Sequence, residues 1–201
     1  MAGVRMAPPE FYEGLRQLCD ERGIILIYDE VQTGVGRTGE WFFAGSAPGA
    51  QVVPDVVTLA KALGSGIPVG ACSVSETIAA HIKENDLGTT FGGGMMAMAA
   101  VIATLEAIEQ DNMLGNVTAV ESHFRESLAS IAGVVEVAGK GFLLGLRFKE
   151  KAGGIHRALL ERQIITGTSS DPHVLRLLPP LCLSKSEVDL FITGLRELCA
   201  G

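Results

Sequence analysis

The chain has 201 residues, a net charge of −7 and 47% hydrophobic residues, so it can form one large or two small domains with buried cores. The acidic balance and the lack of a basic cluster argue against a nucleic-acid partner. The four cysteines form no C-x-x-C pair and the four histidines lack ligand spacing. We therefore expect no disulfide framework, no metal site and a cytoplasmic location.

The first half of the chain alternates a helix with short apolar strands. Residues 1–10 lack the apolar segment of a signal peptide. Pro8 and Pro9 can open a helix, and Gly23 can end it. The strands predicted after it, the first of them buried and parallel, are Ile24–Tyr28, Val56–Ala60 and Val69–Val74. This order predicts an α/β fold.

The uncharged stretch Leu87–Leu105 is long enough to raise the question of a membrane span. Its first half is rich in glycine and threonine, so a buried helix from Met95 to about Gln110 is the better interpretation, and we predict no membrane span. A shorter helix is expected to start at Ser75. The sequence turns polar near Asp111-Asn112, which predicts a domain boundary there, between domains 1–111 and 112–201.

The second half of the chain predicts a small α+β domain. A capping box, Ser184 to Glu187, followed by apolar residues at helical spacing, predicts the last helix of this domain. The other predicted elements are helices near Met113–Ile131 and Ile155–Gln163 and strands at Val134–Val137, Phe142–Phe148 and His173–Leu178. Arg176, in the last strand, could be a plain edge-strand charge.

Two groups with reactive potential follow the predicted strands. Asp29 ends the first strand, and an acid at the end of a buried strand costs desolvation unless a cation meets it. Lys61 ends the second strand beside a glycine-rich turn, where desolvation would make its amine a usable nucleophile. For a lone lysine, a side chain that reaches solvent is the alternative. The carboxyl ends of strands form the ligand crevice of an open α/β sheet, so the presence of both Asp29 and Lys61 at such ends favours a reactive site.

The glycines at 34, 36 and 39 fit the spacing G-x-G-x-x-G of dinucleotide-binding loops. That fingerprint should open a helix directly after its strand. Here five residues separate the strand from the first glycine, and residues 41–49 cannot hold a long helix. A dinucleotide site is therefore disfavoured.

Four segments together resemble the signature of class III aminotransferases, the ornithine/4-aminobutyrate type, which use pyridoxal phosphate. They are IYDEVQTGVGRTG (27–39), VTLAKALGSGIPVGA (57–71), GTTFGGG (88–94) and LRLLPPL (175–181). The resemblance covers nearly the whole chain in the family's order, but only the second half of a family member. It implies that residues 1–111 are the C-terminal part of a type I large cofactor-binding domain with a mostly parallel sheet, and that residues 112–201 are the small α+β domain.

The resemblance also implies roles for single residues. Asp29 would pair with the pyridinium of the cofactor, Val31 would pack on its ring, and Gln32 would reach its phenolic oxygen. Lys61 would form the Schiff base with the cofactor and then move the α-proton of the substrate. Thr90 would reach across from the neighbouring subunit and bind the cofactor phosphate. Arg176 would bind the substrate α-carboxylate.

Several family features have no counterpart in these residues: a phosphate-binding loop, an aromatic residue that stacks on the ring, and a glutamate that pairs with the arginine. Gly94-Met95 also replaces the usual Asn-Pro. We therefore expect a homodimer, or pairing with a missing N-terminal half. The expected small-molecule partners are an amino acid such as acetylornithine or ornithine and a 2-oxo acid such as 2-oxoglutarate. The alternatives are a decarboxylase or aminomutase of the same fold, or an inactive remnant that serves as a binding or scaffold module.

Overall fold

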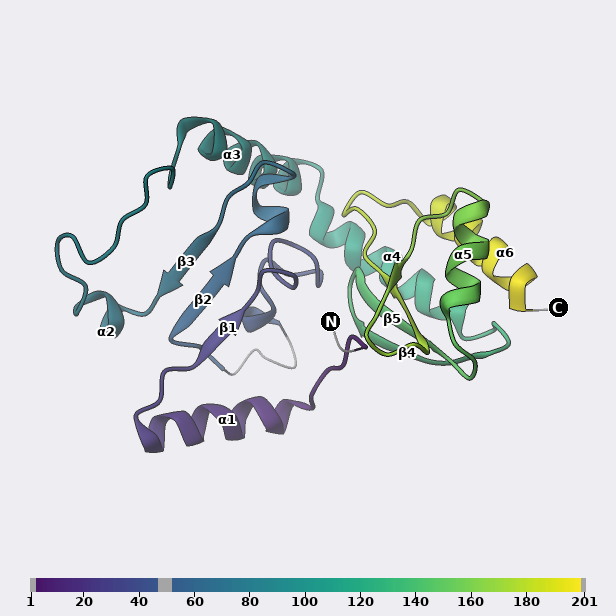
Figure 1. Cartoon of the computed structure of the whole chain (residues 1–201), viewed down its shortest axis with the longest axis horizontal. Helices are drawn as coiled ribbons and strands as arrows, with labels where there is room; N and C mark the ends of the chain where they lie inside the picture. The colour runs from purple at the N-terminus through teal and green to yellow at the C-terminus, as the bar shows by residue number, and fades with distance from the viewer. Residues whose placement is uncertain (1–2, 47–51, 200–201) are drawn as a thin grey trace. The chain divides into compact units, whose positions relative to one another are not determined.

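The computed structural model describes residues 3–46 and 52–199 (Figure 1). They form two compact units: residues 7–112, here called the N-terminal unit, and residues 113–199 together with 3–6, called the C-terminal unit. The match of these units to a cofactor-binding domain and a small domain stays a prediction. Residues 47–49, part of the segment expected to hold no long helix, lie outside the described residues.

The N-terminal unit is built around a mixed three-stranded sheet. Its order is β1-β2-β3, with β1 and β2 parallel and β2 and β3 antiparallel, so the sheet is not mostly parallel over the described strands. The unit contains the helices α1 (Pro9–Arg22), α2 (Glu76–Ala79) and α3 (Met95–Gln110), the strands β1 (Ile27–Asp29), β2 (Val56–Leu59) and β3 (Ala71–Val74), and the 3-10 helices η1 (Phe43–Gly45) and η2 (Lys61–Gly64). The predicted start of α2 after Ser75 and both ends of α3 are confirmed.

Local signals at the ends of α1 act as expected. Pro9 is its first residue, and Gly23 follows its end with φ 63°, a left-handed conformation that glycine adopts without strain. The helix packs against the start of β1 through a small core of Cys19, Leu26 and Val52. This small core leaves much of the apolar surface of the sheet uncovered.

One carboxylate ties helix to sheet in this unit. Asp55 accepts hydrogen bonds from the Leu26 backbone N–H and from Arg16 of α1, both at 2.8 Å. The Leu26 N–H first, and the Arg16 guanidinium with it, hold the pKa of Asp55 below its usual range. Charge-assisted bonds of this kind supplement the small core.

Two expectations of burial in this unit are wrong. The first strand begins only at Ile27, and Ile24, Ile25 and Ile27 are more than half exposed. The strand lies at the edge of the described sheet, and α1 covers only the face that carries Leu26. The apolar helix α3 is also largely exposed, because it packs mainly on η2 and buries only Ile108.

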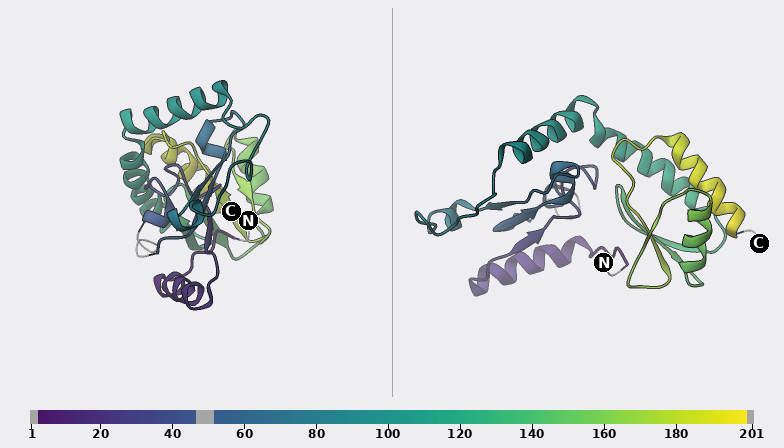
Figure 2. Two further views of the ribbon diagram at one scale, coloured as in Figure 1. Left: turned by 90° about the vertical axis from the view of Figure 1, so that its left-hand side faces the viewer. Right: turned by 45° about the horizontal axis from the view of Figure 1, so that its top comes forward.

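The C-terminal unit is a two-layer α+β arrangement with an antiparallel sheet in the order β4-β5-β7-β6 (Figures 1 and 2). Three helices pack on one face of this sheet and share its hydrophobic core. The elements are α4 (Met113–Leu128), β4 (Val134–Lys140), β5 (Leu143–Phe148), α5 (Gly153–Glu161), β6 (Gly167–Thr168), β7 (Val174–Leu177) and α6 (Lys185–Cys199). The two-residue strand β6 was not predicted, and α4 ends three residues earlier than expected.

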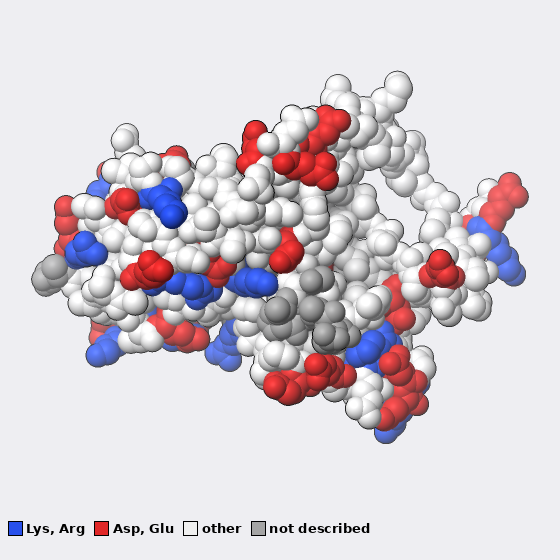
Figure 3. Space-filling model, turned by 180° about the vertical axis from the view of Figure 1, so that it is seen from behind, with Lys and Arg blue, Asp and Glu red and all other residues white. Residues whose placement is uncertain are grey.

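The opposite face of this sheet carries polar and small residues, and the N-terminal segment 3–6 lies on it. The backbone N–H of Gly3 donates to Ser169 Oγ at 3.0 Å. Val4 is 7% exposed and lies over Gly145, where an added Cβ would come within 3.0 Å of the Val4 Cβ. Charged side chains of both signs are interspersed on the face of this unit that Figure 3 shows.

The closing helix α6 confirms the predicted capping box. The Ser184 backbone N–H donates to Glu187 at 2.7 Å, and the Glu187 backbone N–H donates back to Ser184 Oγ at 3.3 Å. The Ser184 N–H first, and then the Ser184 hydroxyl, which donates to the same carboxylate at 2.7 Å, lower the pKa of Glu187. The inner face of the helix is buried as predicted, at Val188, Phe191, Ile192 and Leu195.

The inner face of α6 provides a direct test of the packing. Leu195→Ala removes a fully buried side chain from the core and is expected to lower the free energy of unfolding of this unit by about 2 to 5 kcal/mol. Leu190→Ala, on the same helix but 69% exposed, is the matched control and should change it by less than about 0.5 kcal/mol. Urea unfolding followed by circular dichroism measures both, and similar losses would contradict this packing.

Candidate active site

The parallel pairing of β1 with β2 brings the two reactive candidates to one edge of the sheet. Asp29, the last residue of β1, stands opposite Thr58 in the register. Lys61 follows Thr58 by three residues and begins η2, with only Ala60 between it and the end of β2. Since the carboxyl ends of parallel strands meet at the same edge, Asp29 and Lys61 both lie at that edge of the sheet.

The carboxylate of Asp29 is oriented through only one of its oxygens. Its Oδ1 accepts hydrogen bonds from the Val31 backbone N–H and the Thr58 hydroxyl, each at 3.1 Å. Within residues 3–46 and 52–199, its Oδ2 makes no hydrogen bond. The expectation that Asp29 is buried is wrong, because the edge of the sheet is open there. The carboxylate is thus held in place with one oxygen left for a cation.

Lys61 begins η2 in an unusual backbone conformation. Its φ is 44°, in the left-handed region that a residue with a side chain seldom adopts. Such conformations cost free energy and gather at functional sites, where the surrounding structure imposes them. The side chain is exposed, so the desolvation expected from a buried strand end is absent in the described residues.

Glu30 is a buried carboxylate that organises the loop behind Asp29. It is 2% exposed and accepts hydrogen bonds from the backbone N–H groups of Phe43 at 2.7 Å and Ala44 at 2.8 Å, and from the Thr33 hydroxyl at 3.2 Å. Sequence reasoning missed this role. The alternation of a strand offered the signal, because Glu30 shares the inward side with Leu26 and leaves Asp29 on the other.

The glycine-rich loop after Asp29 forms turns and no helix, as expected for a loop that is not a dinucleotide fingerprint. Gly34 is closely packed, because an added Cβ would lie 3.0 Å from both the Glu30 carbonyl oxygen and the Leu59 side chain. Val31 and Gln32, the predicted cofactor contacts, are half-buried at the start of the loop. In the same loop, burial lowers the pKa of Arg37.

Thr90 is not brought to this edge by any described contact. It lies in the long connection between α2 and α3, where every residue from 81 to 94 is exposed (Figure 1). Its hydroxyl makes no hydrogen bond to any described residue. The structure therefore groups Asp29, Val31, Gln32 and Lys61 but leaves Thr90 on its own.

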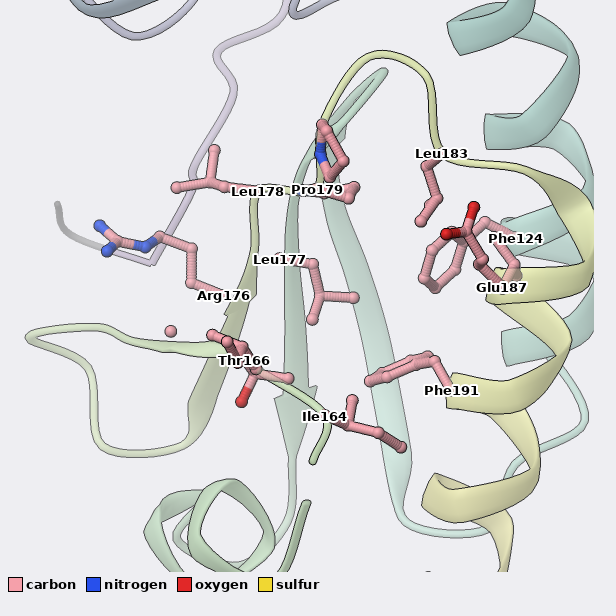
Figure 4. A pocket seen from close by; sticks show the side chains of 14 residues that line it. Phe124, Ile164, Thr166, Arg176, Leu177, Leu178, Pro179, Leu183, Glu187 and Phe191 are labelled. Carbon is pink, nitrogen blue, oxygen red and sulfur yellow. The ribbon is translucent and has the colours of Figure 1, made fainter. Parts of the chain in front are cut away.

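Arg176 lies in the C-terminal unit on β7, between β5 and β6. It is therefore not an edge-strand charge, and that alternative is wrong. Figure 4 shows Leu177 directed toward Phe124 and Phe191, while Arg176 extends away from them. Arg176 and Leu177 both line one largely apolar hollow of about 440 Å³ that adjoins β7. Within the described residues the Arg176 Nε is buried without a hydrogen-bond partner.

Among the described residues, no group of three or more His, Cys, Asp or Glu side chains is placed to hold a metal ion. No helix within residues 3–46 and 52–199 combines the length and the apolar character needed to cross a membrane.

The chain belongs to the class-III aminotransferase family, whose family model matches residues 1–198. Enzymes of this family depend on pyridoxal phosphate. The open oxygen of Asp29 and the amine of Lys61 at one sheet edge suit that cofactor, which offers a cationic ring nitrogen and an aldehyde.

Two of the curated relatives that the chain matches are acetylornithine aminotransferases. The chain is 42% identical to acetylornithine aminotransferase 1 of Bordetella pertussis, over 94% of the chain and 48% of that protein. It is 38% identical to the acetylornithine aminotransferase of Methanocaldococcus jannaschii, over 98% of the chain and 49% of that protein. The chain thus spans about half the length of the curated relatives it matches.

Solved structures agree with this assignment. The structure of Plasmodium falciparum ornithine delta-aminotransferase matches with a TM-score of 0.85 and 29% identity, over 98% of this chain and 53% of that one. A Bacillus anthracis aminotransferase matches with a TM-score of 0.87 and 28% identity, over 98% and 49%. The α/β fold predicted for the family is therefore confirmed.

The loop held by Glu30 can be tested apart from any chemistry. In Glu30→Gln, an amide NH₂ must face one of the donors that the carboxylate accepted, so the loop should lose about 1 to 3 kcal/mol of local stability. Hydrogen exchange at the Phe43 and Ala44 amides should accelerate. Glu40→Gln, an exposed change in the same loop, should leave it unaltered. Unchanged exchange in Glu30→Gln would show that the carboxylate does not hold η1.

Proposed function

We propose that this chain supplies the cofactor-binding edge and the carboxylate-binding arginine of an aminotransferase. The enzyme would move an amino group from an acetylornithine- or ornithine-like donor to a 2-oxo acid such as 2-oxoglutarate. One observation carries the proposal: Asp29, with an unused oxygen, and Lys61, in a left-handed conformation, stand at the same edge of one parallel strand pair. The names of the similar acetylornithine aminotransferases support the donor.

Pyridoxal phosphate, when bound, supplies the electron sink for the reaction. Asp29 would keep a proton on the ring nitrogen through its free oxygen, since its other oxygen is held by Thr58 and Val31. Val31 would pack on the ring and Gln32 would meet the phenolic oxygen, from positions directly after Asp29. The orienting bonds come from the backbone and a hydroxyl, so they leave the charge of Asp29 available.

Lys61 would serve first as the nucleophile that holds the cofactor and then as the base that moves the proton at the substrate α-carbon. Its amine needs freedom to change partners between these two roles. The exposed side chain on a conformationally fixed backbone suits that need. Arg176 would bind the α-carboxylate through its guanidinium, whose charge has no ion-pair partner within the described residues.

The connection between α2 and α3 supports association with another chain. Thr90 stands there among exposed apolar side chains: Leu87 is 74%, Phe91 89%, Met95 91% and Met96 78% exposed. Exposed large apolar side chains that gather in one segment are a candidate interaction surface. We propose that it pairs with a second copy or with an N-terminal half, and that Thr90 binds the cofactor phosphate of that neighbour.

A cytoplasmic location is part of the same proposal. All four cysteines are free thiols, and two of them, Cys72 and Cys182, are exposed. Exposed thiols persist as such in a reducing compartment.

The predicted reaction of the Lys61 amine with pyridoxal phosphate can be tested by covalent labelling. Incubation of the chain with pyridoxal phosphate, followed by borohydride reduction, should place a stable pyridoxyl label on Lys61, because its amine is the predicted nucleophile. Peptide mass mapping identifies the labelled residue. The label should disappear from this peptide in Lys61→Arg.

Lys83→Arg is the matched control, because it changes an exposed lysine of the same unit. It should leave the Lys61 label unchanged. A label spread evenly over surface lysines would contradict the assignment.

A further inference from the structure

Arg176 has a glycine beside it on both neighbouring strands. It pairs with Gly145 of β5 on one side and with Gly167 of β6 on the other. Neighbouring side chains on one face of a sheet lie close enough to touch, so two glycines leave room on both sides of an arginine. The two spaces are filled differently.

The space over Gly145 is occupied by the backbone and side chain of the N-terminal segment. A Cβ at 145 would lie 3.0 Å from the Val4 Cβ and 3.1 Å from the Gly3 carbonyl oxygen. The bond from the Gly3 N–H to Ser169 Oγ fixes this segment to the loop after β6. The side of Arg176 that faces β5 is therefore closed.

The space over Gly167 is occupied by the arginine itself. A Cβ at 167 would lie 3.1 Å from the Arg176 Nε and 3.4 Å from its Nη2. The guanidinium thus rests on the backbone of β6, and this contact buries Nε without giving it a hydrogen-bond partner among the described residues. With Nε turned to the strand, the two terminal nitrogens carry the donors that remain accessible.

We propose that Gly167 is a positioning residue that lays the Arg176 guanidinium flat on β6, so that a carboxylate is bound end-on through the two terminal nitrogens. The inference rests on the proposed carboxylate role of Arg176 and adds the orientation of the ion pair. A side chain at 167 would lift the guanidinium off the strand and turn its fork. Bidentate pairing depends on that orientation, which is why a lysine cannot replace the arginine.

The first measurement needs no ligand. In the ¹⁵N-labelled full chain, the Nε–H signal of Arg176 is identified by its absence in Arg176→Lys. Exchange of this hydrogen with water should be slow in the wild type, where Nε is buried, and faster in Gly167→Ala and Gly167→Val. Gly154→Ala, in α5 of the same unit, is the control because its added Cβ meets nothing within 4 Å. Equal exchange in the wild type and both Gly167 variants would overturn the inference.

The second measurement uses glutarate as a carboxylate probe and glutaramide as its uncharged counterpart, followed through the same signal. Glutarate should shift the signal and glutaramide should not. Gly167→Val should bind glutarate about tenfold more weakly, as expected for the loss of one charge-assisted hydrogen bond, and Gly167→Ala less severely. Wild-type affinity in Gly167→Val would overturn the end-on orientation alone. A wild type that ignores glutarate would instead overturn the carboxylate role of Arg176 in the proposed function.

Discussion

The parallel register of β1 and β2 is the constraint on which the candidate site depends. It places Thr58 opposite Asp29, so one hydroxyl from the second strand holds the carboxylate that ends the first. It also brings Lys61, two residues after the end of β2, to the same edge. Because the orienting bonds use a single oxygen of Asp29, the sheet fixes the direction of the carboxylate without consuming its charge.

Two other carboxylates hold the same region together from either end of β1. Asp55 accepts the Leu26 backbone N–H where the strand approaches, and Glu30 accepts two backbone N–H groups of η1 where it ends. Hydrogen bonds to charged groups are stronger than neutral ones. They matter here because the core beneath the strand contains only a few buried side chains, with Cys19 and Val52 among them. Two of the three acids near this strand therefore stabilise the unit, while the third, Asp29, keeps one oxygen without a hydrogen bond to any described residue.

Local signals allowed much of the fold to be predicted from the sequence. The limits of α3 followed from apolar spacing, and the start of α6 followed from the capping box at Ser184. The burial predicted for Ile24–Tyr28 is wrong, because burial depends on which other elements cover a strand. The residues of the strand itself do not carry that information. The left-handed backbone of Lys61 is likewise imposed by its surroundings. The place of Gly167 beside Arg176 depends on the pairing of a two-residue strand, which is too short to be recognised.

We propose that Asp29 and Lys61 serve the same cofactor molecule. This is tested with pyridoxal phosphate that carries ¹⁵N in its ring and is bound to Lys61 without reduction, in the wild type and in Asp29→Asn. The ¹⁵N chemical shift reports whether the ring nitrogen is protonated. A carboxylate beside that nitrogen favours the charged form and an amide does not. We expect a protonated ring nitrogen at neutral pH in the wild type and an unprotonated one in Asp29→Asn. The same protonation state in both proteins would contradict it.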